Sequence, residues 1–167
     1  MMKIETITKQ HDRKNFDCGH EELNNYLRST ARQSDTKRST RTWVLVDDDV
    51  PTAILGYITL VPSEQNFPEG SKAARTFGKN VPIYRLAKLA VDKNQSGNGF
   101  GHLLLTHAIH LAVAASESVG GTGVVVDCKN NDVVGFYMRY TEHFMPISDD
   151  GLTLWLPITV CAKIVNC

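Results

Sequence analysis

A glycine-rich segment, VDKNQSGNGFGHLL at residues 91–104, determines how the rest of the sequence is interpreted. It follows a nearly continuous apolar run over residues 82–92, which is typical of a strand buried on both faces in a parallel sheet. It leads into residues 100–116, where apolar residues recur at helical spacing at Leu104, Ala108, Leu111, Ala112 and Ala115. Glycines let backbone N–H groups approach an anion, and a helix N-terminus adds partial positive charge. This order of strand, glycine loop and helix indicates a phosphate or pyrophosphate site.

Several loop types are compatible with a glycine-rich connection of this kind. A P-loop requires GxxxxGK[ST], but Gly101 is followed by His102. A dinucleotide fingerprint requires GxGxxG, and from Gly97 and Gly99 the third glycine is replaced by His102. The glycines alone leave two readings open: a loop that binds the pyrophosphate of coenzyme A, and a tight turn that only packs a helix against a strand.

The flanking segments predict alternating strands and helices in one domain over residues 1–167. Strands are expected at residues 2–7, 43–47, 53–61 and 124–128, and helices at residues 20–35 and 131–140. A hairpin is expected at residues 143–156, while the tail from Pro157 shows no clear pattern. Residues 62–81 are expected to form a long polar loop, and loops of this length are usually functional or mobile.

Composition excludes several classes of protein. The chain has 18 Lys and Arg against 18 Asp and Glu and is 42% hydrophobic, which excludes a disordered or fibrous chain. No apolar run approaches the roughly 18 residues of a membrane span, and the charged N-terminus does not resemble a secretory signal. A cytoplasmic location with reduced cysteines is therefore expected. We expect no metal site, because even His107 and His110, which could share a helix face, are better explained by a solvated face.

Several motifs together resemble one family. Residues 91–104 resemble the acetyl-CoA-binding motif of the GNAT N-acetyltransferase superfamily, and Asn130 followed by Phe136 and Tyr137 resembles a later GNAT motif, N-x5-F-Y. The opening Phe16–Gly19 (FDCG) and the ending at residues 144–157 resemble the branch that contains the toxins of bacterial type II toxin–antitoxin systems. The resemblance implies an α/β (α+β) GNAT fold. Its twisted central sheet is mixed but mostly antiparallel, with two splayed parallel strands and flanking helices.

The same resemblance implies an acetyl-CoA-dependent N-acetyltransferase. In this family Tyr137 would donate a proton to the coenzyme A thiolate, and a phenol of pKa ~10 is protonated at neutral pH. Three positions, Ser96, Lys88 and His143, depart from the family pattern. The residues implied in binding acetyl-CoA are Leu89, Ala90, Val91, Gln95, Ser96, Gly97, Asn98, Gly99, Phe100, Gly101, Asn130 and Phe136.

The acceptor is less well defined by the sequence. No general base is evident, since Glu64, Glu69, Asp92 and Asp127 are candidates by charge alone. An α-amine of pKa ~7.7–8.0 needs little help from a base. The toxin branch implies aminoacyl-tRNA as acceptor, and a basic run could face its phosphates or could simply be a solvated surface. This run consists of Arg28, Arg32, Lys37, Arg38 and Arg41. A net charge of zero is lower than that of a typical dedicated RNA binder.

Two other functions remain open. The chain could be a GNAT enzyme that acetylates a small amine or a protein N-terminus, or a non-catalytic acetyl-CoA-binding partner of a regulator. The presence of Tyr137 argues against the second of these. If the toxin resemblance holds, a small DNA-binding antitoxin is the expected partner, together with a homodimer and no membrane association.

Overall fold

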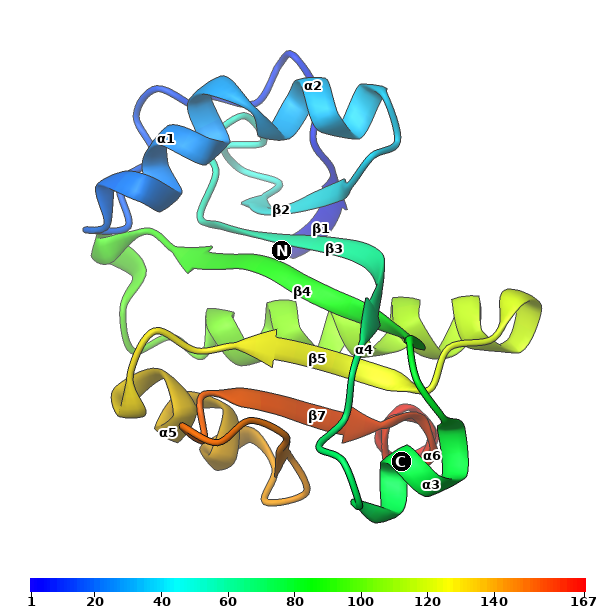
Figure 1. The fold of residues 1–167 in the computed structure, drawn as a ribbon. Coiled ribbons are helices and arrows are strands. Elements are labelled where there is room, and N and C mark those ends of the chain that lie inside the picture. The colour runs from blue at the N-terminus through cyan, green and yellow to red at the C-terminus, as the bar shows by residue number, and fades with distance from the viewer. The chain divides into compact units, whose positions relative to one another are not determined.

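The computed structural model describes residues 1–167. Its strands form one seven-stranded sheet in the order β1-β2-β3-β4-β5-β7-β6 (Figure 1). The strands are β1 (Met2–Thr6), β2 (Arg41–Asp47), β3 (Gly56–Gln65), β4 (Val81–Val91), β5 (Gly123–Asp127), β6 (Met145–Pro146) and β7 (Thr153–Pro157). The helices are α1 (Glu21–Ser29), α2 (Ala31–Thr36), α3 (Lys72–Phe77), α4 (Phe100–Val119), α5 (Asn131–Tyr140) and α6 (Ile158–Val165), with a 3-10 turn η1 (Lys93–Gln95).

The pairing of the strands confirms the predicted mixed sheet. β4 and β5 are parallel, with Tyr84 opposite Val124 and Leu86 opposite Val126. The pairs β1–β2, β2–β3, β5–β7 and β6–β7 are antiparallel. Strand β4 continues to Val91, beyond its last residue paired with β5. None of the helices is long and apolar enough to cross a membrane.

Two compact units make up the chain: residues 1–61 with 87–108, and residues 62–86 with 109–167. Strands β3 and β4 and helix α4 contribute residues to both units. The single domain predicted for residues 1–167 stays a prediction.

The first unit is built around α1, α2 and the strands β1 to β3. Helix α2 contacts β2, and Figure 1 shows α1 and α2 in light blue above this strand. Phe16, Leu27, Val44 and Tyr57 belong to its buried core. The Tyr57 hydroxyl donates a hydrogen bond of 2.7 Å to the Leu23 carbonyl, so the ring also fixes the position of α1.

The second unit has its own core, in which Phe67 packs edge-on against Trp155 with ring centroids 4.8 Å apart. Helix α6 packs against β5 and β7. Gly123 allows β5 and β7 to approach closely, because a Cβ there would lie only 2.3 Å from the Leu156 carbonyl oxygen.

Two predictions about local structure are wrong. The helix expected at residues 20–35 is broken at Thr30, whose φ of −126° is not helical; the Ser29 hydroxyl competes there by bonding to the Asn25 carbonyl. Residues 62–81 are not an irregular polar loop, since β3 extends to Gln65, α3 follows, and Phe67 is buried. The tail after Pro157, for which the sequence makes no prediction, is helix α6.

Candidate functional site

The glycine loop lies between a strand and a helix, as the sequence predicts. Asp92 caps the turn η1 by accepting the Asn94 N–H at 2.9 Å, and the chain then passes through Ser96 into α4. Gly97 and Gly99 have φ values of +84° and +75°, which side chains other than glycine rarely adopt. At either position a Cβ would meet nothing within 4 Å. The glycines therefore serve the backbone conformation rather than close packing, which argues against the simple packing turn and leaves room for an anion at the start of α4.

The FDCG segment holds this loop in place. The Asp17 carboxylate lies 2.9 Å from the Lys93 ammonium, and the Lys93 N–H donates to the Asp17 carbonyl, also at 2.9 Å. The Asp17 N–H in turn donates to the Asp92 carboxylate at 3.2 Å. Lys93, the Gly19 N–H and the Asn24 amide, in that order, hold the pKa of Asp17 well below its usual range. In the sequence, FDCG stands out only as a family signature, and nothing in its spacing indicates this positioning role.

The start of β3 lies close beside the end of β4, its neighbour in the sheet. A Cβ at Gly56 would lie 3.0 Å from the Ala90 carbonyl oxygen and 2.9 Å from a methyl group of Leu104, so only glycine fits there without a shift. Ala90 is buried, while Leu89 and Val91 are partly buried. Lys88, one of the departures from the family pattern, places its ammonium 5.2 Å from the centre of the Tyr26 ring, a cation–π contact.

The predicted proton donor lies in the second unit. Tyr137 on α5 is 5% exposed, and its ring makes edge-on contacts with Phe144 at 5.4 Å and Phe136 at 5.1 Å. Burial, with a smaller contribution from Cys128, raises the pKa of Tyr137 above its usual value. The phenol is thus protonated at neutral pH, as a proton donor must be. Asn130 caps α5 by accepting the Val133 N–H at 3.0 Å, which accounts structurally for its place in the motif.

The candidate bases have other roles or no defined setting. Asp92 accepts backbone N–H groups, and Asp127 is paired with Arg85 and accepts the Thr153 hydroxyl at 3.1 Å. Glu64 is exposed. Glu69 lines a cavity beside α3. The structure thus identifies none of these four carboxylates as a general base.

The predicted basic run does not form one surface of free cations. Arg28 on α1 is paired with Glu21, and Arg41 lies 3.6 Å from Asp35. Arg32 is half-buried on α2. Lys37 and Arg38 are exposed in the connection to β2 and take part in no ion pair. Arg32 takes part in no ion pair either, so two of the five cations, Lys37 and Arg38, are both exposed and unpaired.

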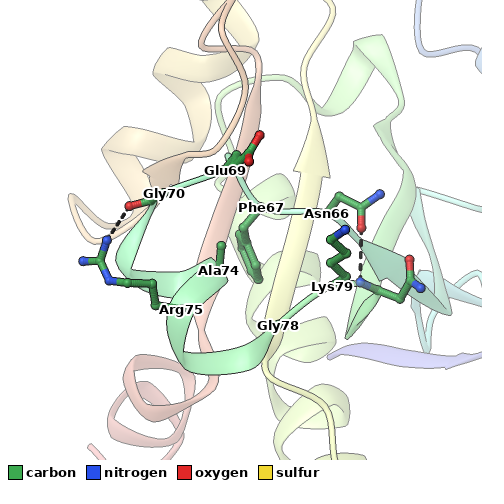
Figure 2. Close-up of a pocket in the computed structure, with 9 residues that line it drawn as sticks. Asn66, Phe67, Glu69, Gly70, Ala74, Arg75, Gly78 and Lys79 are labelled. Atoms are coloured by element: carbon green, nitrogen blue, oxygen red, sulfur yellow. Dashed lines mark hydrogen bonds between the residues drawn. The ribbon is translucent and has the colours of Figure 1, made fainter.

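A cavity of about 640 Å³ lies beside α3 in the second unit (Figure 2). Figure 2 shows Phe67 at its wall and Arg75 turned back to the Gly70 carbonyl. The Asn80 N–H donates to the Asn66 side-chain oxygen at 3.1 Å. The charged lining residues of the cavity, Glu69, Arg75 and Lys79, are of both signs. The cavity therefore has no clear preference for an anion or a cation.

These features can now be set beside known proteins. The chain belongs to the acetyltransferase (GNAT) family, whose model matches residues 5–141. A tRNA-acetylating toxin of Mycobacterium tuberculosis is 26% identical over 141 residues, which are 84% of this chain and 83% of that protein. The solved structure of AtaT complexed with acetyl-methionyl-tRNAfMet is similar with a TM-score of 0.87, 28% identity and 99% of each chain covered. A tyrosine-to-phenylalanine mutant of the AtaT toxin, bound to the C-terminus of the antitoxin AtaR and acetyl-CoA, gives a TM-score of 0.83, 27% identity and 99% coverage of both chains.

The comparisons confirm the predicted acetyltransferase class and the resemblance to GNAT toxins. They do not test the individual residues. The assignments of Tyr137, of the loop at residues 95–101 and of the basic run stay predictions.

Proposed function

We propose that the protein is a toxin that transfers the acetyl group of acetyl-CoA to the amino group of an aminoacyl-tRNA. The observation that carries the proposal is the glycine loop at the N-terminus of α4, held by Asp17 and Lys93 in a conformation with open space around Gly97 and Gly99. The similarity over almost the whole chain to toxins that are solved with acetyl-CoA or with an acetylated aminoacyl-tRNA supports both the donor and the acceptor.

The first unit supplies most of the residues proposed to hold acetyl-CoA. Backbone N–H groups of residues 95–101 and the start of α4 bind the pyrophosphate, because the first N–H groups of a helix lack partners within it. The backbone of residues 89–91 binds the pantetheine arm and directs an N–H group to the thioester oxygen. Asn130 and Phe136, in the second unit, complete the proposed set. When bound, acetyl-CoA supplies the acetyl group as a thioester.

The proposed reaction needs one proton donor from the protein. The neutral amine forms a bond to the thioester carbonyl carbon, and the carbon–sulfur bond breaks. Tyr137 gives its proton to the departing sulfur and becomes a phenolate. The proton lost by the amine passes to water, and water returns one proton to the Tyr137 oxygen, which regenerates the phenol. An α-amine of pKa ~7.7–8.0 is partly neutral at physiological pH, which accounts for a site without an evident general base.

The acceptor contributes binding energy through its phosphates. Lys37 and Arg38 are the exposed and unpaired members of the basic run, whereas Arg28 and Arg41 must give up or share a carboxylate partner. Remote binding energy of this kind can be used in the transition state, so a free amino acid is expected to be a poor substrate. A cytoplasmic location, a DNA-binding antitoxin and a homodimer belong to the same proposal.

The test incubates the purified protein with labelled acetyl-CoA and a pool of charged tRNAs. Label on the aminoacyl group, absent with free amino acids, is the expected result, and activity should fall steeply as salt is raised. Charge reversal at Lys37 and Arg38, the exposed and unpaired members of the run, should raise KM for tRNA and leave acetyl-CoA binding unchanged. Efficient acetylation of a polyamine or peptide amine, with no label on tRNA, would contradict the proposal and favour the small-amine enzyme, which the net charge of zero also fits.

A further inference from the structure

A second cavity, of about 390 Å³, lies in the first unit beside the segment that follows β1. It is enclosed by residues 9–14 and by Arg28 of α1. Four of its lining side chains are cationic, namely Lys9, Arg13, Lys14 and Arg28, while Asp12 is the one acidic residue among them. The cavity therefore carries an excess of positive charge on a chain whose net charge is zero.

The acid and the histidine of this cavity already have partners. The Asp12 carboxylate accepts the N–H groups of Lys14 at 3.1 Å and Asn15 at 3.2 Å, together with the Asn15 side-chain amide at 2.6 Å. His11 accepts the Thr8 N–H at Nδ1, so its Nε2 carries the proton that is donated to Glu5 at 2.8 Å. Neither side chain needs a ligand to satisfy its hydrogen bonds. The Asp12 carboxylate offsets only one of the four positive charges that line the cavity.

Three of the four cations take part in no ion pair with a carboxylate: Lys9, Arg13 and Lys14. Lys9 and Lys14 are exposed, and Arg13 is partly buried with one guanidinium N–H directed to the Arg28 carbonyl at 3.4 Å. Like charges held together in a concavity repel one another. A bound anion would relieve that repulsion, because it lies close to several cations at once.

The backbone that carries these cations is held firmly. The Asp12 N–H donates to the Thr52 carbonyl at 2.8 Å, and Asp12 forms an isolated parallel bridge with Ala53. The His11 N–H closes a turn on the Thr8 carbonyl at 3.3 Å. A ligand that binds here orders side chains rather than a loop, which lowers the entropic cost of binding.

We infer that this cavity binds backbone phosphates of the tRNA substrate, an inference that rests on the proposed function. Apart from the enclosed His11, no aromatic side chain lines the cavity, so it offers no surface on which a base could stack. Flexible lysines at its rim suit sequence-independent contacts to phosphodiester groups. Through Arg28 the cavity joins the predicted basic run and extends it to the segment after β1.

The experiment uses the double variant Lys9→Gln/Lys14→Gln in the full chain. The matched control is Lys79→Gln/Lys163→Gln, which removes the same charge from two exposed lysines of the second unit. The cavity variant should raise KM for aminoacyl-tRNA several-fold and weaken binding of deacylated tRNA, followed by fluorescence anisotropy. The slope of log affinity against log salt should become shallower by about 2, since each lost phosphate contact contributes about 0.9. The control variant should match the wild type in KM for aminoacyl-tRNA, in affinity for deacylated tRNA and in the salt slope.

The outcomes separate the two proposals. In one outcome the wild-type protein acetylates tRNA, but the cavity variant and its control have the same KM for tRNA and the same salt slope. This result overturns the cavity proposal and leaves the proposed function standing. A wild type that acetylates only small amines overturns the proposed function, and binding of deacylated tRNA then decides the cavity independently. Stabilisation of the wild type, but not of the cavity variant, by inorganic phosphate over chloride at equal ionic strength, with KM for tRNA unchanged, would assign the cavity to a free phosphate and overturn the RNA assignment.

Discussion

The Asp17 carboxylate lies 2.9 Å from the Lys93 ammonium and thereby joins the turn before α1 to the loop that follows β4. Both side chains are about half exposed, at 45% and 59%, so solvent screens the attraction between them. Two backbone hydrogen bonds connect the same segments, from the Lys93 N–H to the Asp17 carbonyl and from the Asp17 N–H to the Asp92 carboxylate. The pair is thus one part of a short network that determines where the glycine loop begins.

This network predicts a pH-dependent effect of Asp17→Asn. The folded-state pKa of Asp17 lies below the unfolded value of about 3.9, so its stabilising effect is fully present above about pH 4 and is lost as pH falls through the folded pKa. Thermal melts should show a lower Tm for the variant from pH 5 to 8. The difference in Tm between the wild type and the variant should shrink progressively below pH 4.

The control for this measurement is Asp49→Asn, because Asp49 is an exposed acid that takes part in no ion pair. Its melting curve should follow that of the wild type at each pH. A gap for Asp17→Asn that is the same at pH 3 and pH 7 would show that the carboxylate charge is not what stabilises this network.

Gly99 gives a test of the pyrophosphate site. Gly99→Asp should weaken acetyl-CoA binding at least tenfold, because it places a negative charge beside the phosphates. Gly99→Asn is the matched variant: its backbone meets the same cost at φ +75°, and asparagine tolerates this region about as well as aspartate. Calorimetry should give an acetyl-CoA affinity for Gly99→Asn that is much closer to the wild-type value than that of Gly99→Asp. Equal acetyl-CoA affinity in both variants and the wild type would remove the loop from the site.

The sequence predicted those parts of the fold that depend on local signals. Helix α5 has the predicted bounds, 131–140, since Asn130 caps its start and the apolar spacing continues along it. The glycine loop was recognised because positive φ values need glycine and because an apolar run precedes it. The break at Thr30 was missed, since the apolar spacing from Leu23 to Ala31 continues across it.

Relationships between distant segments could not be predicted in the same way. Nothing in the spacing of FDCG indicates that Asp17 would contact Lys93, because that contact is created by the fold. The sequence did not reveal the cationic cavity, because three other residues separate Lys9 from Arg13 and Lys14. These cations share a cavity with Arg28 only once α1 is packed. Helix α6 gave no signal because apolar residues occupy most of its positions, which hides the helical period.

Substitution by alanine should change the free energy of unfolding in opposite directions at Gly123 and Gly135. Gly123→Ala should destabilise the protein by about 1–3 kcal/mol, since its Cβ would lie 2.3 Å from the Leu156 carbonyl oxygen, a backbone atom that cannot move without disturbing β7. Gly135→Ala should be stabilising by about 0.5–1 kcal/mol, because alanine favours a helix and its Cβ meets only the flexible end of Arg139 at 3.2 Å. Chemical denaturation measures both. A stabilised Gly123→Ala would contradict the close approach of β5 and β7.

The role of Tyr137 is tested by Tyr137→Phe. The variant keeps the ring contacts with Phe144 and Phe136, so the fold and the affinity for acetyl-CoA should be unchanged. Loss of a positioned proton donor should lower kcat by ~10²–10⁴-fold. Single-turnover kinetics with charged tRNA measure this directly, because they isolate the chemical step from product release.

Tyr84→Phe is the matched control for that substitution. Tyr84 is also a buried tyrosine of the second unit, and its hydroxyl donates to the Gly120 carbonyl at 2.5 Å. Its removal should cost about 1 kcal/mol of stability, because a hydrogen bond is lost, and should leave kcat at the wild-type value. If Tyr137→Phe turns over at the wild-type rate while binding acetyl-CoA normally, the leaving sulfur takes its proton from another source and Tyr137 only packs α5 against Phe144. If both variants lose the same fraction of kcat, the loss reflects a general effect on the fold and the assignment of the proton donor fails.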